Sequence, residues 1–226
     1  MASPERRFHP VDGIALPARA PRPPRTGIRA DRAFTANVLG TLAQTISDRV
    51  RLGTEAAAHH GAATPAALVT LLWYPDRPIT FLAARLRITH PGAVQLSERL
   101  AAEGLVERIP GEDGRTRLLA LTAVGERMAL AVLAARRDVL TRAVDALDDD
   151  QVRALADAAD AMLEALADDL LTSEYMCRLC DELACPDARC PVEQAVPTPP
   201  HRRGTGYGVP DAPARSRDNP PTTSAE

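Results

Sequence analysis

Apolar residues recur at intervals of three or four along the middle of the chain, which is the period of an amphipathic helix. The interval is clearest in 31–60, where the apolar positions are Phe34, Val38, Leu42, Ile46 and Val50. Shorter apolar stretches follow at 64–74, 79–87 and 91–103, and Pro or Gly residues separate them. Because Pro and Gly interrupt helices, the pattern predicts one long helix followed by three short ones.

The period changes after Gly104, which ends the fourth helix. The stretches "LVERI" and "TRLLAL" flank the turn-rich "PGEDGR", which predicts a two-stranded hairpin. Thr122 is expected to cap a helix to about residue 147, and Asp148 and Gln151 have capping-box spacing for a last helix to 172. The apolar stripe of that last helix comprises Val152, Leu155, Ala159, Met162, Leu166 and Leu170.

The two ends of the chain lack periodic apolar positions. Residues 1–30 are rich in Pro and Arg, and 193–226 are rich in Pro, so both are expected to be disordered. Between them we expect a folded domain over 31–172 and a four-cysteine motif over 173–192. The start "MASPERRFHP" has no apolar leader core, and no apolar run is long enough to span a membrane. A cytoplasmic protein without membrane contact is therefore expected.

Composition supports a helical protein, while charge must be read locally. Aromatic residues make up only 3% of the chain, and most of the apolar residues are Ala, Leu and Val. All 27 basic residues are Arg, which is typical of a GC-rich genome and does not by itself indicate phosphate binding. The net charge is −3, but 77–117 carries seven Arg against five acidic residues, whereas 122–175 carries five Arg against twelve. The local field decides where a polyanion docks.

Two short helices, a tight turn and a two-stranded hairpin make a winged helix-turn-helix. The residues "LAARL", "ERLAAEGLVER", "EDGRTR" and "LALTAVG" occur here in order and resemble the multiple antibiotic resistance regulator (MarR) family over about 31–172. The resemblance implies a mainly α fold in which long flanking helices interlock into a homodimer. It also implies a bacterial, nucleoid-associated regulator, most often a repressor, that binds palindromic double-stranded DNA. In many members of the family a small ligand or an oxidant releases the DNA.

The helix at 91–103 is the expected reader of the major groove, which admits a helix and displays distinct donor and acceptor patterns. Gln95 is the first candidate for base contact, because an amide pairs bidentately with adenine. Gly92 either permits close backbone approach or is simply tolerated in a first helical turn. Thr89 and His90 compete for the cap, and Pro91 favours His90. The outward-facing candidates of this helix are His90, Gly92, Gln95 and Arg99.

Arginines elsewhere in the motif are candidates for backbone contacts. The resemblance places a minor-groove arginine at Arg115, with Arg117 beside it, although a solvated hairpin charge is the alternative for both. Phosphate contacts that position the protein are assigned to Arg77, Arg85 and Arg87, each of which is equally compatible with an ordinary surface Arg. Arg87 also departs from the family, which commonly has Gly in this turn, and Pro78 is a poor helix cap.

Family pockets usually lie where the dimerisation helices meet the winged domain. His59, His60, Trp73 and Tyr74 fall near that junction and are candidates for a small-molecule effector site. The alternative is that Trp73 and Tyr74 belong to the core and that the histidines are exposed.

All four cysteines, Cys177, Cys180, Cys185 and Cys190, lie within fourteen residues. Their C-x2-C-x4-C-x4-C spacing is compatible with structural zinc, because two thiolates two residues apart can share one tetrahedral ion. An iron–sulfur cluster and redox-active thiols without a metal remain open, and Arg178 and Arg189 would favour thiolates. We expect the cluster at the end of the dimerisation platform, where metal loss or oxidation would shift half-site spacing.

Two other classes of function remain open. The chain is either a dimeric DNA-binding regulator, a thiol or metal redox protein with a helical scaffold, or a winged-helix adaptor that binds protein instead of DNA. No hydrolase triad, phosphate-binding loop or carboxylate pair is recognisable in the sequence, so we expect a protein that is not an enzyme.

Overall fold

The computed structural model describes residues 31–59, 61, 63–111 and 116–196. By contact, the chain divides into two units, 1–41 and 42–226, and each is described by itself. The described part of the first unit is the start of helix α1 (Arg32–Ala58), which continues into the second unit. Asp31 begins this helix, because its carboxylate accepts a hydrogen bond from the backbone N–H of Ala33 at 3.1 Å. The long first helix predicted from the apolar spacing is confirmed.

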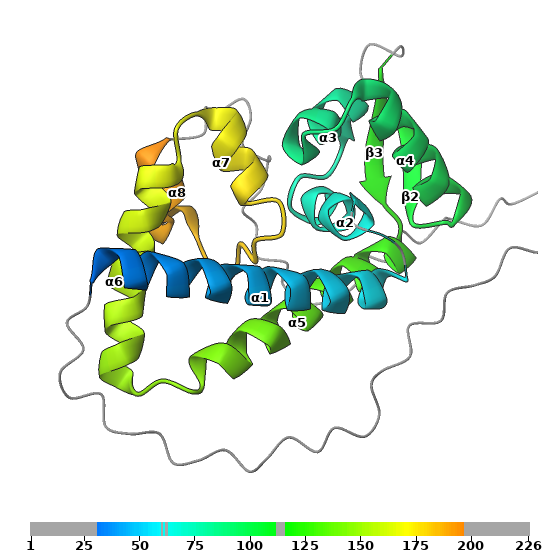
Figure 1. The fold of residues 1–226 in the computed structure, drawn as a ribbon. Coiled ribbons are helices and arrows are strands. Elements are labelled where there is room, and N and C mark those ends of the chain that lie inside the picture. The colour runs from blue at the N-terminus through cyan, green and yellow to red at the C-terminus, as the bar shows by residue number, and fades with distance from the viewer. Residues whose placement is uncertain (1–30, 60, 62, 112–115, 197–226) are drawn as a thin grey trace, which may run out of the picture. The chain divides into compact units, whose positions relative to one another are not determined.

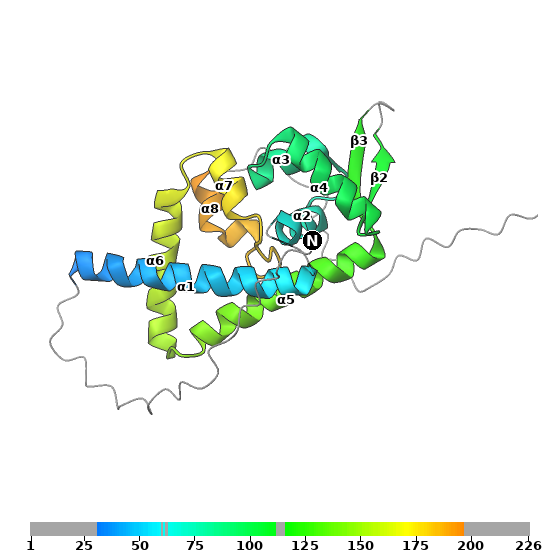
Figure 2. The ribbon, with the colours of Figure 1, turned by 45° about the vertical axis from the view of Figure 1, so that its right-hand side comes forward.

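The second unit contains a winged helix-turn-helix (Figures 1 and 2). Its three strands form an antiparallel sheet in the order β1-β3-β2, with Val106 of β2 opposite Leu121 of β3. The sequence predicted β2 and β3, but not the two-residue β1. The elements, in chain order, are α2 (Ala63–Trp73), β1 (Arg77–Pro78), α3 (Ile79–Leu86), α4 (His90–Ala102), β2 (Val106–Pro110), β3 (Arg117–Leu121) and α5 (Ala123–Val144).

Helix α2 is the centre of the core of this unit. Every residue from Thr64 to Leu71 is buried, which fits a helix that is apolar on all sides. Helices α3, α4 and α5 and strand β3 pack against it. The largest fully buried leucine and valine side chains are Leu68, Val69, Leu71, Leu82, Leu100, Leu119 and Val132.

The junction between the sheet and α5 depends on one threonine and one glycine. The Thr122 hydroxyl donates to the carbonyl oxygen of Gly104 at 2.6 Å and accepts from the N–H of Gly125 at 3.1 Å. A Cβ at Gly125 would overlap the carbonyl oxygen of Leu105. The family-like stretch "LALTAVG" is therefore a cap followed by the close approach of two backbones, and the predicted Thr122 cap is confirmed.

The C-terminal part of the chain differs from the single helix expected up to 172. The predicted capping box of Asp148 and Gln151 is present at the start of α6 (Asp149–Leu166). The helix then ends, and Asp169 caps a new helix, α7 (Leu170–Met176), by accepting from the N–H of Thr172 at 2.8 Å. A 3-10 turn η1 (Asp187–Arg189) and helix α8 (Pro191–Ala195) follow, so α8 crosses position 193, where the tail was expected to begin.

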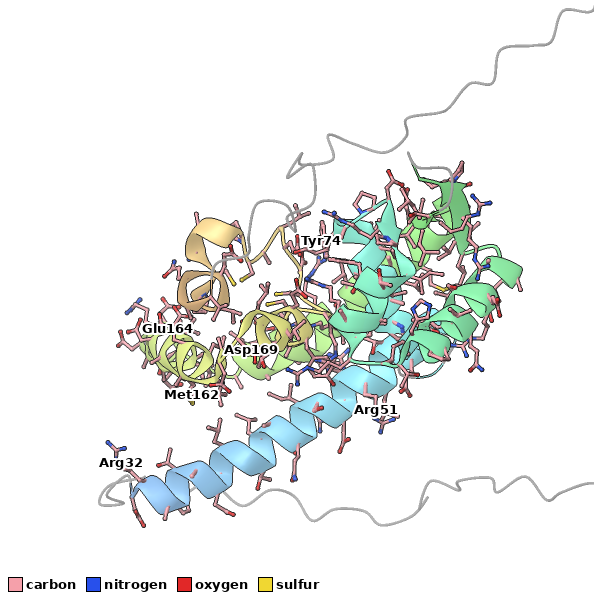
Figure 3. The ribbon with its side chains drawn as sticks, turned by 90° about the horizontal axis from the view of Figure 1, so that it is seen from above. Arg32, Arg51, Tyr74, Met162, Glu164 and Asp169 are labelled. Atoms are coloured by element: carbon pink, nitrogen blue, oxygen red, sulfur yellow. The ribbon has the colours of Figure 1, made fainter. Side chains whose placement is uncertain are left out.

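Two helices leave apolar side chains exposed. Helix α6 has no buried residue, and Met162, labelled in Figure 3, is one of its exposed apolar side chains. The exposed large apolar residues of α1 are Phe34, Val38, Leu39, Leu42 and Leu52, and those of α6 are Val152, Leu155, Met162 and Leu166. Among the residues that the structure describes, no helix combines the length and apolarity needed to cross a membrane.

Candidate nucleic-acid interface and cysteine cluster

Helix α4 has one buried and one exposed face. Leu96 and Leu100 are buried against the core, whereas Gln95 and His90 are exposed. The cap is Thr89, whose hydroxyl accepts from the N–H of Gly92 at 3.2 Å, so the preference for His90 as cap was wrong. Pro91 occupies the second helical position behind a threonine cap, and His90 is the first helical residue.

Gly92 is explained by this cap. A Cβ at Gly92 would lie 3.2 Å from the Thr89 hydroxyl, which is tighter than an ordinary contact. The missing side chain therefore leaves room for the capping hydroxyl as well as for a ligand at the start of α4. The first helical turn is therefore free of a side chain at Gly92, whether the glycine serves the cap or the approach of DNA.

Arginines brace α4 from two sides. Arg99 is exposed, but it donates from Nη2 to the Thr64 hydroxyl at the start of α2 at 3.2 Å. Arg108 of β2 donates to the Ser97 hydroxyl at 2.9 Å and lies 3.8 Å from the Glu98 carboxylate. Sequence reasoning missed Arg108, because a charged residue in a short strand gives no signal of a contact with the preceding helix.

The hairpin presents Arg117 as an exposed side chain of β3, opposite Pro110 of β2. Arg115 lies outside the described residues. Arg117 is therefore placed at the tip end of the two paired strands, as the motif predicted.

Arg85 is not available to a DNA backbone, and its assignment as a phosphate contact was wrong. Only 4% of the residue is exposed. Its guanidinium lies over the Tyr74 ring at 4.2 Å and 3.8 Å from the Glu182 carboxylate. Arg77 is half-buried, with its guanidinium 5.3 Å from the centre of the Phe81 ring.

Arg87 forms the helix-turn-helix turn in the left-handed conformation, with φ 52° and ψ 43°. The family's usual Gly fits this conformation without strain. Arg87 remains exposed, but its guanidinium donates to the Thr172 hydroxyl at 2.8 Å and lies over the Tyr175 ring at 4.9 Å. Helix α7 is thus attached to the turn that joins α3 and α4.

Trp73 and Tyr74, two of the effector candidates, are half-buried, and His60 lies outside the described residues. The Trp73 indole N–H donates to the carbonyl oxygen of Cys180 at 3.0 Å, so the cysteine segment covers it. Tyr74, labelled in Figure 3, packs against Phe81, and burial raises the pKa of its hydroxyl above the usual range. His59 is exposed. A wider hollow of about 530 Å³ lies elsewhere, between α2, the sheet and α5, with Asp76, Glu107 and Glu126 in its wall.

The four cysteines are free thiols that contact one another. Cys177 is hydrogen-bonded to Cys180 and Cys190, and Cys185 is hydrogen-bonded to the same two partners. The contacts close a ring of four sulfur atoms. As the side chains stand, no group of three or more His, Cys, Asp or Glu in the described ranges is placed to hold a metal ion.

The ring alternates between two kinds of thiol. The hydrogen bond from Cys177 lowers the pKa of Cys180 to about 7 and that of Cys190 to about 6. Arg136 also favours the Cys180 thiolate, and the N–H of Glu193 favours that of Cys190. Those hydrogen bonds raise the pKa of Cys177, and burial followed by the neighbouring thiolates raises that of Cys185 to about 12. Cys180 and Cys190 therefore favour the thiolate, and Cys177 and Cys185 favour the protonated thiol.

The ring lies beside the end of α6. Ala167, Cys190 and Val192 form a small core with Leu163 of α6, which agrees with the expected position after the last helix. The ring is also attached to the winged helix, through the Trp73 and Arg85 contacts and through α7, which packs against α3 (Figure 1). This second attachment was not predicted from the sequence.

No protein-family model matches the sequence, and no curated protein matches it. Solved structures do match. The YusO protein of Bacillus subtilis superposes with a TM-score of 0.54 at 19% identity, over 61% of this chain and 99% of that one. A MarR family protein of Bacillus stearothermophilus gives 0.52 at 21% identity, over 58% and 91%. MepR, a transcription regulator of the Staphylococcus aureus multidrug efflux pump MepA, gives 0.52 at 16% identity, over 58% and 97%.

These structures are covered almost completely, whereas about two fifths of this chain has no counterpart in them. Structural similarity at sequence identities near 20% establishes the fold alone. The motif pieces quoted from the sequence lie on the elements that the architecture assigns to them: "LAARL" on α3, "ERLAAEGLVER" from α4 into β2, and "LALTAVG" from β3 into α5. The chain therefore has the winged helix-turn-helix fold of MarR family transcription regulators.

Proposed function

We propose that the protein is a sequence-specific DNA-binding transcriptional regulator, most simply a repressor, that acts as a homodimer in the bacterial cytoplasm. The observation that carries the proposal is the exposed face of α4. Thr89 caps the helix, Leu96 and Leu100 fix its buried face, and Gln95 is left exposed. A helix supported in this way fits the major groove, where Gln pairs with adenine.

The wing supplies the second contact. Arg117 is exposed on β3, and Arg108 ties β2 to α4, so helix and hairpin would meet DNA as one rigid body. Basic residues of a wing bind phosphate or a narrow minor groove. MepR, which shares the fold, is itself a transcription regulator. No catalytic step is part of the proposal.

Dimerisation follows from the apolar faces of α1 and α6. Leu155 of α6 is 42% exposed and Phe34 of α1 is 54% exposed, and a monomer gains nothing from exposing such side chains in rows. A second copy of the chain is the occupant that the two half-sites of a palindrome require. Leu155→Glu should convert the dimer to a monomer in light scattering, whereas Leu183→Glu, at a leucine that is 60% exposed and lies outside both helices, should not.

DNA binding is tested by selecting sites from a random duplex library and measuring the affinity by fluorescence anisotropy. Gln95→Ala should weaken binding by about 1–3 kcal/mol and relax the preference at one base position. Arg117→Ala should lower the dependence of log affinity on log salt by about one contact. Gln44→Ala, an exposed glutamine on α1, is the control. If no duplex is selected, or if both variants bind unchanged, the protein-binding adaptor is the better reading.

The release signal is also part of the proposal. The cysteine ring contacts α2 and, through Glu182, α3, so a metal or redox change at the ring has a direct route to the DNA-binding helices. A small ligand is the alternative signal, and the hollow between α2, the sheet and α5 is the candidate site for it. If the cysteine ring receives the signal, chelator or peroxide should change the affinity for the operator. If a small ligand is the signal, both reagents should leave that affinity unchanged.

A further inference from the structure

The strongest unassigned feature of the molecule is the ring of four thiols. We propose that Cys177, Cys180, Cys185 and Cys190 bind a single Zn²⁺ ion, and that the ion holds the cysteine segment on α2 and α3. The proposal depends on the geometry of residues 173–193 and not on DNA binding.

The spacing of the sulfur atoms favours one ion. Each thiol is within hydrogen-bonding reach of two others, and the contacts run around all four. In a tetrahedral site with Zn–S bonds of about 2.3 Å, neighbouring sulfur atoms are roughly 3.8 Å apart, which is also the reach of an S–H···S contact. The thiols stand hydrogen-bonded to one another and not yet around a point. A zinc ion bound here would replace the S–H···S contacts by S–Zn bonds.

The balance of the step is simple. One Zn²⁺ ion gains four thiolate ligands, and every thiol that is still protonated releases its proton to solvent. The resulting site carries a net charge of −2. Arg85 lines the same cavity, and Arg136 lies close enough to Cys180 to stabilise its negative charge. Arg85 is itself paired with Glu182, which lines the cavity together with Glu174 and Glu193, so the two arginines offset only part of the negative charge.

The arrangement of the four thiols favours one zinc ion over an iron–sulfur cluster or disulfide bonds. All four thiols line one small space of about 40 Å³. In an iron–sulfur cluster the cysteines bind different irons that sulfide ions bridge, which places their sulfur atoms farther apart than hydrogen-bonding reach. A disulfide would use the thiols two at a time and would not require all four to contact one another.

The surroundings of the ring are those of a ligand site. Cys190 directly precedes α8, is only 8% exposed and packs with Val192 and Ala167. Its sulfur atom is therefore held in a small apolar core beside the other three thiols.

The ion would order a segment that has little regular structure. Between α7 and α8 only η1 is helical, yet this stretch makes the contacts that reach the winged helix. The carbonyl oxygen of Cys180 accepts from Trp73, Glu182 lies against Arg85, and Asp181 lies 3.5 Å from Arg137. A structural zinc ion makes such a loop fold, because the free energy of binding becomes free energy of folding.

Metal content is the first test. The full-length protein, purified without chelator and without air, should contain one zinc per chain by elemental analysis, and its four thiols should react slowly with a thiol reagent until a chelator is added. Co²⁺ exchanged into the site should show the visible absorption of a tetrahedral thiolate complex. A protein without bound zinc whose four thiols react freely, acid-labile sulfide with iron, or two disulfides would each overturn the proposal.

Trp73 provides the second test, because it is the only tryptophan in the chain and it donates to Cys180. Chelation should shift its fluorescence toward that of an exposed indole, and added Zn²⁺ should reverse the shift. Cys185→Ser should lose most of the bound zinc and show the shifted emission without chelator. Leu183→Ala, at an exposed position of the same segment, should keep both the metal and the emission.

Circular dichroism distinguishes undocking from unfolding of Cys185→Ser, since the winged helix should keep its helical signal. Zinc that stays bound to Cys185→Ser at the wild-type ratio would overturn the four-ligand site. So would an emission that ignores complete removal of the metal, because the ion would then not hold the segment.

Discussion

Glu182→Ala should release the cysteine segment from the winged helix. The side chains of Arg85 and Glu182 are 5% and 12% exposed, and their charges are 3.8 Å apart. At an effective dielectric constant of 20, two unit charges at this distance attract by roughly 4 kcal/mol before desolvation is subtracted. Removing one partner of a buried pair costs about 3–5 kcal/mol, because the remaining charge stays buried.

The expected loss lies at the lower end of that range. Arg85 keeps its contact with the Tyr74 ring at 4.2 Å, which retains about 1–2 kcal/mol. Tyr74 is hydrogen-bonded to Glu182 as well and loses that partner. We therefore expect the docking of the segment to weaken by about 3 kcal/mol, or roughly 150-fold in the docking equilibrium. The winged helix should stay folded, because undocking returns Arg85 to water.

The assay is Trp73 fluorescence against urea, with circular dichroism to follow the helices. Undocking should appear as a fluorescence change at lower urea than the loss of helix. The matched control is Asp181→Ala in the same segment. Its ion pair with Arg137 involves side chains that are 17% and 63% exposed, so its loss should cost less than about 1 kcal/mol.

A double-mutant cycle decides whether the two charges act on each other. Arg85→Met with Glu182→Met should recover most of the docking free energy that Glu182→Ala loses, since an apolar pair of similar volume replaces a buried ion pair at little cost. The reasoning is refuted if Glu182→Ala costs no more than Asp181→Ala, or if the two Met substitutions are simply additive.

Three further predictions rest on single positions. Gly125→Ala should destabilise the protein by about 3 kcal/mol in thermal unfolding, because its Cβ overlaps the carbonyl oxygen of Leu105; a loss below 1 kcal/mol (about the size of an ordinary surface change) would contradict the close approach. Arg87→Gly should be more stable than Arg87→Ala by about 1 kcal/mol, because both lose the same contacts and only Gly relieves the left-handed turn; equal stabilities would contradict the strain. The hydrogen bond from the N–H of Thr172 lowers the pKa of Asp169. The stability that this cap gives to α7 should therefore be complete above the ordinary carboxyl pKa and be lost as the pH falls through the lowered value. Hydrogen exchange should show this loss for α7 in the wild type and not in Asp169→Asn.

Local sequence signals were sufficient for most of the fold. The apolar period located every helix of the winged motif, and short-range caps such as Thr122 and the Asp148–Gln151 box set their starts. These signals act over three or four residues, so one sequence contains them completely. Misses occurred where two signals competed, as at Thr89 and His90, or where an element was too short to have a period, as in the two-residue strand β1.

The break between α6 and α7 shows a second limit. Asp168 and Asp169 interrupt an apolar stripe that otherwise continues to Leu170, and the stripe was the stronger pattern. The structure shows Asp169 accepting from Thr172, which is a cap and therefore a helix start. A pair of acidic residues late in a long predicted helix is a cap signal that sequence reasoning can use.

The burial of Arg85 could not be predicted from the local sequence. A charged residue on a short amphipathic helix is exposed by default, and that default led to its assignment as a phosphate contact. It is buried because Glu182 meets it from a segment almost a hundred residues later, and Trp73 meets the Cys180 carbonyl across 107 positions. Neither partner is visible in any local pattern, so the position of the cysteine ring had to come from the tertiary structure.

That position changes how a signal at the cysteines would reach DNA. A ring at the end of the dimer helices would change the distance between two half-sites, and chelation would then alter which spacer length binds best. Besides packing beside α6, the ring contacts α2 and α3, and α7 holds Arg87, the left-handed residue of the turn before α4. Loss of these contacts would loosen each reading helix within its own protomer. Chelation should therefore weaken binding at every spacer length by a similar factor, and a changed preference for spacer length would return the effect to the dimer helices.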